Sequence, residues 1–396
     1  MIAERHLAKK PEDVGIDSER LQGLFARAQR DVEQGLLTSV QVAVARQGKV
    51  AGMRTFGNAI QGGRRQPATD RTLYPLFSCT KGIVGVAMWA LFEEKLLRPD
   101  ERVADIIPEF STNGKSVVTV EQLLLHTAGV PHANILPDDW HDRGKRLEAF
   151  GKWKLGWEPG SRFEYHITSA HWVLAELIHR RAGIDYRDFI RERLAKPMEL
   201  DELFLGSPPE FDDRVADFQL VADGEPVPPP DGWGVGEVTP AMLLYLNEPR
   251  HRRVGVPGGG AIGGAGELAL FYQTLINRGE TASGTRVFKP ETIEFANQVR
   301  TTAQHRDPMY GNVPVNRGLG LIVAGDDGFA HFRSFGKTTS PRAFGHPGAG
   351  GQIAWGDPVS GISLGYCIDG FADWMVQGRR ITAISSLAGS CGLDGR

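Results

Sequence analysis

The sequence predicts an α+β protein in which strands from both ends of the chain form one antiparallel sheet and helices fill the middle. Two hairpin patterns carry this prediction. Apolar residues alternate at period two over 40–57 around a short Gly-containing turn, and again over 351–366 around Gly356-Asp357-Pro358. Helical spacing dominates between the hairpins, and this order of elements argues against strict βαβ alternation.

Helical patterns follow one another along the middle of the chain. Apolar spacing predicts a first helix over Ser18 to Glu33, and a long apolar run after Ser78 predicts a buried second one. Further helices are expected at about 119–126, 169–182, 185–196 and 265–278. The Pro-rich stretch from about Gly206 to Thr239 is expected to be a loop or a covering flap, because helical patterns resume on both sides.

Length and composition are those of an ordinary soluble globular protein. The 396 residues have 41% hydrophobic content and a formal charge of −3, with 45 Lys+Arg against 48 Asp+Glu. Without a basic stripe there is no electrostatic case for a nucleic-acid partner. The first ten residues lack the apolar core of a signal peptide, and no run is long and uncharged enough to span a bilayer. A cytoplasmic protein without a membrane partner is therefore expected, and its oligomeric state stays open.

Ser78-Cys79-Thr80-Lys81 stands at the head of the apolar run. On a helix, Ser78 and Lys81 lie on one face, with the hydroxyl at the positively polarised N-terminus. Serine needs a base to become a nucleophile, and burial would depress the lysine pKa enough to provide one. Cys79 points about 100° away and cannot share the Lys81 face. The alternative is an ordinary buried helix that begins with a capping serine.

A second S-x-x-K sequence occurs at 334–337, among Gly, Pro and Thr and without an apolar run behind it. We interpret that copy as chance. The three cysteines, Cys79, Cys367 and Cys391, form neither a disulfide framework nor metal-ligand spacing.

Tyr165 is the best candidate for a second titrating group beside Lys81. It follows a turn marked by Pro159-Gly160 and immediately precedes the helical segment that starts near Thr168. A phenol beside an ammonium is expected to have a lowered pKa and to shuttle protons between serine and leaving group. The alternative is an aromatic side chain that only packs at the start of a helix.

Taken together, five motifs in order resemble the serine β-lactamase-like superfamily, in the branch of class C β-lactamases, family VIII carboxylesterases and D-aminopeptidases. These motifs are Ser78-x-x-Lys81, Leu124-Leu125-His126-Thr127-Ala128-Gly129, Pro159-Gly160-x-x-Phe163-x-Tyr165, Gly258-Gly259-Gly260-Ala261-Ile262 and Gly345-His346-Pro347-Gly348-Ala349-Gly350-Gly351. The resemblance spans about residues 15–370 and implies a β-lactamase/transpeptidase-like fold.

The resemblance also implies roles for individual residues. Ser78 would be the acylated nucleophile, Lys81 would hold or accept its proton, and Tyr165 would act as general base and then acid. The oxyanion hole would consist of the backbone N–H groups of Ser78 and Ala349. The predicted substrate-binding residues are His346, Gly348 and Trp157, the last from a group of tryptophans, Trp140, Trp153, Trp157 and Trp172, whose alternative is core packing.

Two departures from the family pattern favour an ester over a β-lactam. His166 and Ile167 follow Tyr165, so the asparagine that helps bind a lactam side chain is missing. His346 and Pro347 replace the lysine and threonine of the third β-lactamase motif. Both changes remove polar recognition of an anionic lactam and keep the nucleophile machinery.

Other motifs carry weaker functional interpretations. His126 is expected to pack or to cap a helix end. A metal set drawn from His126, His132, His141 and Asp138 lacks paired spacing, so no metal is predicted. Gly258-x-Gly260-x-x-Gly263 matches a dinucleotide fingerprint without a preceding strand, and we interpret it as a loop before a helix.

The predicted protein is a serine hydrolase that cleaves small carboxylic esters through an acyl-enzyme, without cofactor or metal. The alternatives are a β-lactamase, a D-amino-acid peptidase or amidase, an acyltransferase and a non-catalytic scaffold. One catalytic unit over 1–396 is expected, with an α/β subdomain from 1–70 and 290–396 and a mainly helical one from 71–289. Whether Lys81 or Tyr165 is the principal base stays open, because coupled groups titrate as a unit.

Overall fold

A computed structural model describes residues 2–222, 225–227 and 240–393. Within these ranges, one seven-stranded sheet has the order β11-β12-β13-β14-β1-β2-β3, and all its neighbouring strands are antiparallel. Its strands are β1 (Ser39–Arg46), β2 (Lys49–Gln61), β3 (Arg64–Pro67), β11 (Ile322–Val323), β12 (Phe344–Pro347), β13 (Ile353–Asp357) and β14 (Ile362–Ile368). The N-terminal and C-terminal hairpins meet where β1 pairs with β14, so the predicted α+β class with a sheet built from both termini is confirmed.

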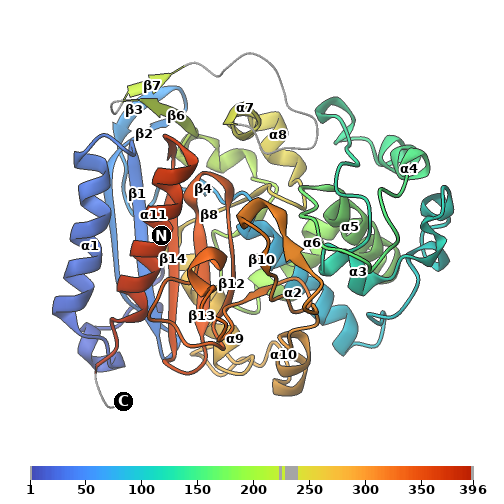
Figure 1. Ribbon diagram of the computed structural model, residues 1–396. Coiled ribbons are helices and arrows are strands. Elements are labelled where there is room, and N and C mark those ends of the chain that lie inside the picture. The colour runs from blue at the N-terminus through green and yellow to red at the C-terminus, as the bar shows by residue number, and fades with distance from the viewer. Residues whose placement is uncertain (1, 223–224, 228–239, 394–396) are drawn as a thin grey trace.

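Helices cover both faces of this sheet (Figure 1). The first and last helices, α1 (Ser18–Glu33) and α11 (Trp374–Gly389), pack together on one face, and α9 (Ala265–Ile276) packs on the other. Gly365 on β14 allows the close approach of α9, because a Cβ there would lie 1.9 Å from Ala265 O. The α1 bounds are those predicted, whereas no apolar pattern had indicated α11.

The remaining helices form the middle of the chain on the α9 side. They are α2 (Cys79–Glu93), α3 (Val120–Leu124), α4 (Arg143–Lys152), α5 (Ser169–Ala182), α6 (Tyr186–Ile190) continued by a π-turn (Arg191–Ala195), α7 (Pro240–Leu243), α8 (Pro249–Val254) and α10 (Pro290–Ala296). The helices expected at 119–126, 169–182, 185–196 and 265–278 are confirmed by α3, α5, α6 with its π-turn, and α9. The proposed division into two subdomains stays a prediction.

Short strands form three further small sheets among the described residues. They are β4 (Tyr74–Pro75), β8 (Ala261–Gly263) and β5 (Phe204–Leu205) in one sheet, β9 (Arg306–Asp307) and β10 (Val313–Pro314) in another, and β15 (Gly370–Phe371), β6 (Gln219–Ala222) and β7 (Glu225–Val227) in the third. Part of the stretch expected to be an irregular flap therefore contains a 3₁₀ turn, Pro209–Arg214, and two strands. Residues 228–239 of that stretch lie outside the described ranges.

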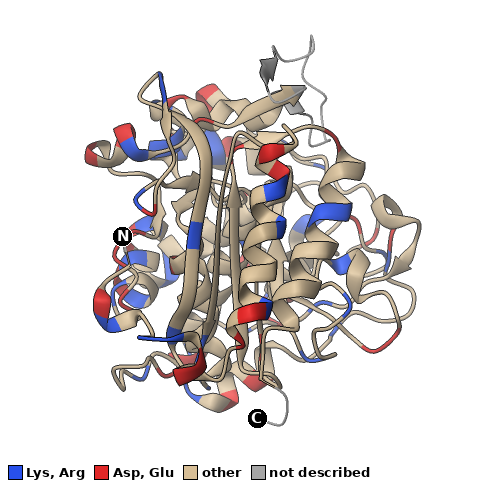
Figure 2. Ribbon diagram, turned by 90° about the vertical axis from the view of Figure 1, so that its left-hand side faces the viewer, with Lys and Arg blue, Asp and Glu red and all other residues tan. Residues whose placement is uncertain are grey.

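Surface charge agrees with the balanced composition. Lysine, arginine, aspartate and glutamate are interspersed over the ribbons that face the viewer in Figure 2. Within the described ranges, no helix has both the length and the apolar character needed to cross a bilayer.

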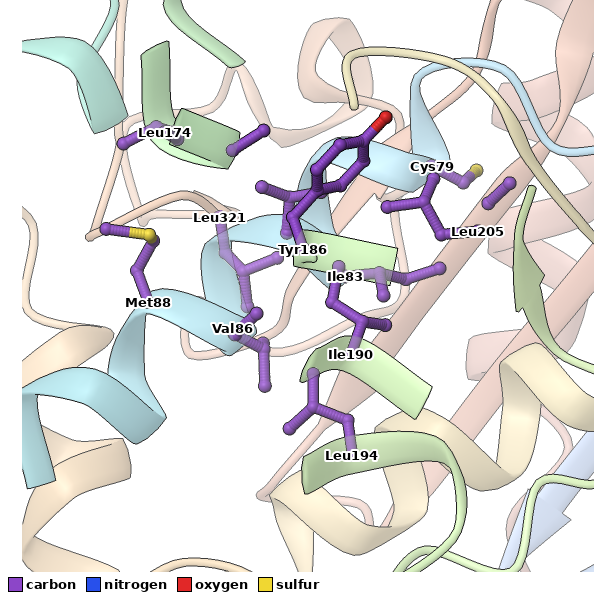
Figure 3. Packing of buried hydrophobic residues seen from close by; sticks show 14 of the residues in the cluster. Cys79, Ile83, Val86, Met88, Leu174, Tyr186, Ile190, Leu194, Leu205 and Leu321 are labelled. Carbon is purple, nitrogen blue, oxygen red and sulfur yellow. The ribbon is translucent and has the colours of Figure 1, made fainter. Parts of the chain in front are cut away.

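The α2 helix is buried on all sides, which explains its apolar sequence. Figure 3 shows Ile83 and Val86 packed against Ile190 and Leu194, and Leu321 approaches from another side. Gly82 and Gly85, within α2, lie where neighbouring segments come closest. A Cβ on Gly82 would lie 2.8 Å from the Tyr272 hydroxyl and 3.6 Å from the His346 Cβ.

Gly85 provides a test of this packing. A Cβ there would lie 2.9 Å from Gly320 Cα. This contact is with the backbone, which cannot shift as easily as the end of a flexible side chain. We expect Gly85→Ala to lower the free energy of unfolding by about 1–3 kcal/mol in denaturant titrations, as overpacking does. Gly23→Ala in α1 is the matched control, because its Cβ meets nothing within 4 Å. Better helix propensity makes that variant more stable by about 1 kcal/mol, and a loss as large as that of Gly85→Ala would contradict the packing argument.

Candidate active site

Ser78 lies at a sharp turn between β4 and α2. The preceding residue, Phe77, has φ 43°, in the left-handed region that costs a non-glycine residue energy. Ser78 occupies the N-cap position of α2, yet its side chain makes no capping hydrogen bond. Ser78 is therefore not the ordinary capping serine of the alternative interpretation, and its hydroxyl is available for other contacts.

Lys81 comes one turn later and faces Ser78. Its side chain is fully buried, and Nζ lies 3.1 Å from Ser78 Oγ. Nζ also donates a hydrogen bond to Gly258 O at 2.6 Å, which ties α2 to the glycine turn before β8. Burial, followed by the positive charge of Arg317, holds the pKa of Lys81 well below its usual range. The unprotonated amine predicted from the apolar sequence is thus favoured by the fold.

Tyr165 reaches the same place from the loop before α5. Lys81 Nζ lies 4.9 Å from the centroid of its ring, and the phenol is near enough to Ser78 for hydrogen bonding to that side chain to affect its pKa. Burial raises the pKa of Tyr165, and the Ser78 hydrogen bond and the Arg317 charge only partly oppose this shift. The expected lowering of the phenol pKa is therefore wrong, because desolvation dominates and the neighbouring lysine is not an ammonium.

His126 lies against the Tyr165 ring, and His166 in turn holds His126 in place. His126 stacks on it at 4.8 Å with an interplanar angle of 16°, and His126 Nδ1 accepts a hydrogen bond from the His166 N–H at 2.9 Å. The His166 ring donates from Nδ1 to Glu164 O and accepts from the Val130 N–H at Nε2. Burial lowers the pKa of His166 to about 3, so this ring is a neutral structural bridge. His126 packs, as expected, and here it packs against the candidate catalytic phenol.

The third motif lies on β12 beside the start of α2. His346 is buried, its Nδ1 lies 2.7 Å from Pro347 O, and its ring centroid is 6.2 Å from that of Tyr165. Burial and the Arg317 charge hold the pKa of His346 well below its usual range, so the ring is neutral. Nε2 has no hydrogen-bond partner among the described residues.

The predicted oxyanion donors are both unpaired. Among the backbone hydrogen bonds of the described chain, neither the Ser78 N–H nor the Ala349 N–H has an acceptor. Gly348 allows β12 to approach the turn before Ser78, because a Cβ there would lie 2.6 Å from Leu76 O. Two free N–H groups at the head of α2 and after β12 are what an oxyanion hole requires, and their role stays a prediction.

The predicted tryptophan group separates in the fold. Trp157 lies against His166, with ring centroids 6.2 Å apart, and the Arg162 guanidinium lies over the Trp157 ring at 4.2 Å. Trp153 packs on Phe150 in the core. Trp140 and Trp172 line a separate cavity of about 220 Å³. Core packing thus describes Trp153, and the substrate contact proposed for Trp157 stays a prediction.

Other sequence candidates lie outside this arrangement. The Cys79 thiol donates to His346 O at 3.2 Å, and burial raises its pKa, which disfavours the thiolate. Ser334, in the second S-x-x-K sequence, follows a 3₁₀ turn with φ 75° and begins no helix. Across the described ranges, no three His, Cys, Asp or Glu side chains are arranged to hold a metal ion, and His132 pairs with Glu164 instead.

A family model described as Beta-lactamase matches residues 24–385. The chain belongs to the β-lactamase family. Within this family it is similar to the Esterase/beta-lactamase LipL of Mycobacterium tuberculosis, with 27% identity over 316 residues. This match covers 73% of this chain and 67% of LipL. It is also similar to Esterase EstB of Burkholderia gladioli, with 27% identity over 365 residues, covering 85% of this chain and 84% of EstB.

A solved structure supports the same β-lactamase-family assignment. It is a penicillin-binding protein homolog from Caulobacter crescentus, with a TM-score of 0.77 and 26% identity, covering 94% of this chain and 98% of that one. The β-lactamase/transpeptidase-like fold is confirmed, and the chain is a hydrolase of the serine β-lactamase fold.

Sequence reasoning missed one buried residue that lies beside this candidate site. Arg317 is buried, and its guanidinium carbon lies 5.7 Å from the Tyr165 ring centroid and 5.4 Å from that of Phe163. Its Nη1 has no hydrogen-bond partner among the described residues. The only local signal is an arginine next to the apolar run Leu319-Gly320-Leu321-Ile322, which does not reveal where its side chain points.

Proposed function

We propose that this β-lactamase-family protein is a serine esterase that cleaves small carboxylic esters through an acyl-enzyme on Ser78. One observation carries the proposal: Ser78 Oγ lies 3.1 Å from the amine of Lys81, which is fully buried and whose pKa is lowered. A neutral amine beside a hydroxyl is a base in place for nucleophilic attack.

The first half of the reaction follows from these contacts. A neutral lysine amine has two N–H donors and one lone pair, and Gly258 O occupies one of the donors. The lone pair takes the proton of Ser78 Oγ as this oxygen attacks the ester carbonyl. The Ser78 and Ala349 N–H groups then hold the developing oxyanion.

Tyr165 completes the proton transfers. Because its pKa is raised, the phenol is protonated at neutral pH and can give its proton to the departing alkoxide. The Lys81 ammonium, 4.9 Å from the ring centroid, then returns a proton to the phenolate. Water attacks the acyl-enzyme with the proton flow reversed, which releases the carboxylic acid and restores the Ser78 hydroxyl.

The surroundings of these three residues support an ester rather than a lactam. His166, where the lactam-binding asparagine is missing, uses both ring nitrogens to bridge the loop and offers none to a substrate. His346 is neutral and Pro347 has no hydroxyl, so the third motif lacks a charged anchor. EstB is named an esterase, and LipL an esterase/beta-lactamase.

Covalent labelling tests the nucleophile. We expect a fluorophosphonate to form an adduct on Ser78, located by peptide mass spectrometry, and Ser78→Ala to lower kcat for p-nitrophenyl acetate by about 10⁴-fold or more. Ser334→Ala, in the second S-x-x-K sequence, is the matched control and keeps both activities. An adduct elsewhere, or undiminished turnover in Ser78→Ala, would refute the mechanism.

A substrate panel tests the ester assignment. Aryl esters, nitrocefin and D-alanyl amides are compared at equal enzyme concentration, with and without an added alcohol or amine acceptor. We expect esters to have the highest kcat/KM. Dominant lactam or amide turnover would overturn the ester assignment and leave the acyl-enzyme intact, and dominant transfer to the acceptor would identify an acyltransferase.

A further inference from the structure

Two buried basic side chains lie against one phenol ring. Lys81 Nζ is 4.9 Å and Arg317 Cζ is 5.7 Å from the Tyr165 ring centroid, and the two residues are 0% and 3% exposed. Within the described residues, neither takes part in an ion pair. The Asp307 carboxylate interacts electrostatically with Arg317, but the two groups are too far apart to form an ion pair. An uncompensated buried charge is expensive, so the site cannot readily hold two.

Arginine and lysine respond differently to such a site. The guanidinium stays protonated in proteins, whereas a buried lysine loses its proton readily. Arg317 is therefore the fixed charge, and Lys81 is the group that becomes neutral. The direction of the Lys81 pKa agrees with this division, because Arg317 is the second cause of its lowering after burial.

The backbone around Arg317 is held firmly. Its N–H donates to Thr301 Oγ1 at 3.1 Å, its carbonyl accepts from the Arg300 N–H at 2.8 Å, and it forms an isolated bridge with Ile322, the first residue of β11. Phe163 supports the guanidinium at 5.4 Å. The charge is thus placed by the fold and not by a carboxylate partner.

No other described group near the ring offers a permanent positive charge. His126 and His346, the two rings beside Tyr165, are both neutral. The titratable and charged groups that face Tyr165 or Arg317 are Ser78, Cys79 and Lys81 on α2, His126 after α3, His166 and His171 near the start of α5, Asp307 and Tyr310 around β9, and His346 on β12.

We propose that Arg317 is a positioning residue whose fixed positive charge keeps Lys81 unprotonated as the base and stabilises the Tyr165 phenolate formed when the leaving group is protonated. This role rests on the proposed serine esterase mechanism. It requires no contact between Arg317 and the substrate, since the guanidinium acts through the two proton carriers at one ring.

The pH dependence of Ser78 labelling tests the Lys81 half of the proposal. We measure the rate of fluorophosphonate labelling from pH 5 to 10 in the full chain and in Arg317→Gln, Arg317→Lys and the control Arg306→Gln, which removes an exposed charge from the same segment. In Arg317→Gln we expect the midpoint to move up by about one pH unit, so that labelling below it slows about tenfold. Arg306→Gln keeps the wild-type midpoint. In Arg317→Lys we expect an upward shift like that of Arg317→Gln, because an amine buried at this site loses its proton readily.

Leaving-group dependence tests the Tyr165 half. A p-nitrophenolate leaves without a proton, whereas an alkoxide requires one. In Arg317→Gln we expect kcat/KM to fall about tenfold more for an alkyl ester than for the p-nitrophenyl ester of the same acid. The thermal midpoint of Arg317→Gln does not fall, because no ion pair is broken, and a large fall would indicate a structural role and overturn the proposal.

Further outcomes separate the two levels of the argument. An unlabelled Ser78 in the wild type contradicts the proposed function itself. If Ser78 is labelled but the pH midpoint of labelling is unchanged in Arg317→Gln, only the role of Arg317 is contradicted. A rise in KM confined to esters that carry a carboxylate, with an unchanged pH profile, would show that Arg317 binds the substrate and would overturn the positioning role.

Discussion

Replacing Lys81 by methionine is expected to lower kcat/KM for an aryl ester by about 10³-fold, within the range that general base catalysis contributes. Methionine keeps the volume of the buried stem and removes the amine that lies 3.1 Å from Ser78 Oγ. Steady-state kinetics from pH 5 to 9 give the measurement. In the wild type, activity falls with decreasing pH as Lys81 gains a proton, and this limb is absent in the residual activity of Lys81→Met.

The protonation of Lys81 also affects the stability of the fold. The folded-state pKa of Lys81 lies below the unfolded value, so between the two values the unfolded chain binds one more proton than the native protein. This difference makes stability rise with pH across that window, and it is a cost at neutral pH. Lys81→Met removes this cost but also removes the hydrogen bond to Gly258 O, so the two effects oppose each other and we expect its unfolding midpoint at pH 7 to lie close to that of the wild type.

Lys115 provides the matched control. It is also fully buried, yet its Nζ donates to Thr112 O and Trp153 O, remote from Ser78. Lys115→Met removes both hydrogen bonds, although Thr112 O keeps the Lys115 N–H and Trp153 O keeps Asn113 Nδ2 as donors. We expect it to lose about 1–3 kcal/mol of stability, as the loss of hydrogen bonds from a charged group does, and to keep its kcat/KM. Loss of stability without loss of activity in Lys81→Met would contradict the assignment of the base.

Replacing Tyr165 by phenylalanine is expected to reduce turnover most for esters whose leaving group must be protonated. For an alkyl ester we expect kcat/KM to fall about 10²–10⁴-fold, and for the p-nitrophenyl ester of the same acid about tenfold or less. The raised phenol pKa determines the sign of the pH effect: alkyl ester turnover is lost as pH rises through that pKa. This alkaline limb disappears in Tyr165→Phe.

The control for this variant is Tyr366 on β14. Its hydroxyl is buried without a hydrogen-bond partner among the described residues, and the ring packs in the core on the α1 and α11 side. Tyr366→Phe therefore keeps both ester activities. Equal losses on the two esters in Tyr165→Phe would show that the phenol acts before the leaving group departs, as the base.

The parts of the fold that the sequence predicted are those in which apolar residues recur at a regular spacing over a short segment. The hairpins that become β1, β2, β13 and β14, and the helix α1, follow from apolar spacing over a few residues. The C-terminal helix α11 was not predicted, and the described part of the expected flap contains two strands. These elements are held by contacts with distant parts of the chain, which short patterns do not record.

For the candidate site, the sequence by itself determined the Ser78 and Lys81 pair. Two residues separated by three positions on a helix lie about one turn apart on the same face, whatever surrounds them. Only the tertiary structure decided the protonation of the site. The sign of the Tyr165 pKa and the presence of Arg317 depend on which side chains displace water around one ring, and that is set by segments more than 80 residues apart in the sequence. Desolvation is a property of the packed molecule, so no local pattern could have revealed it.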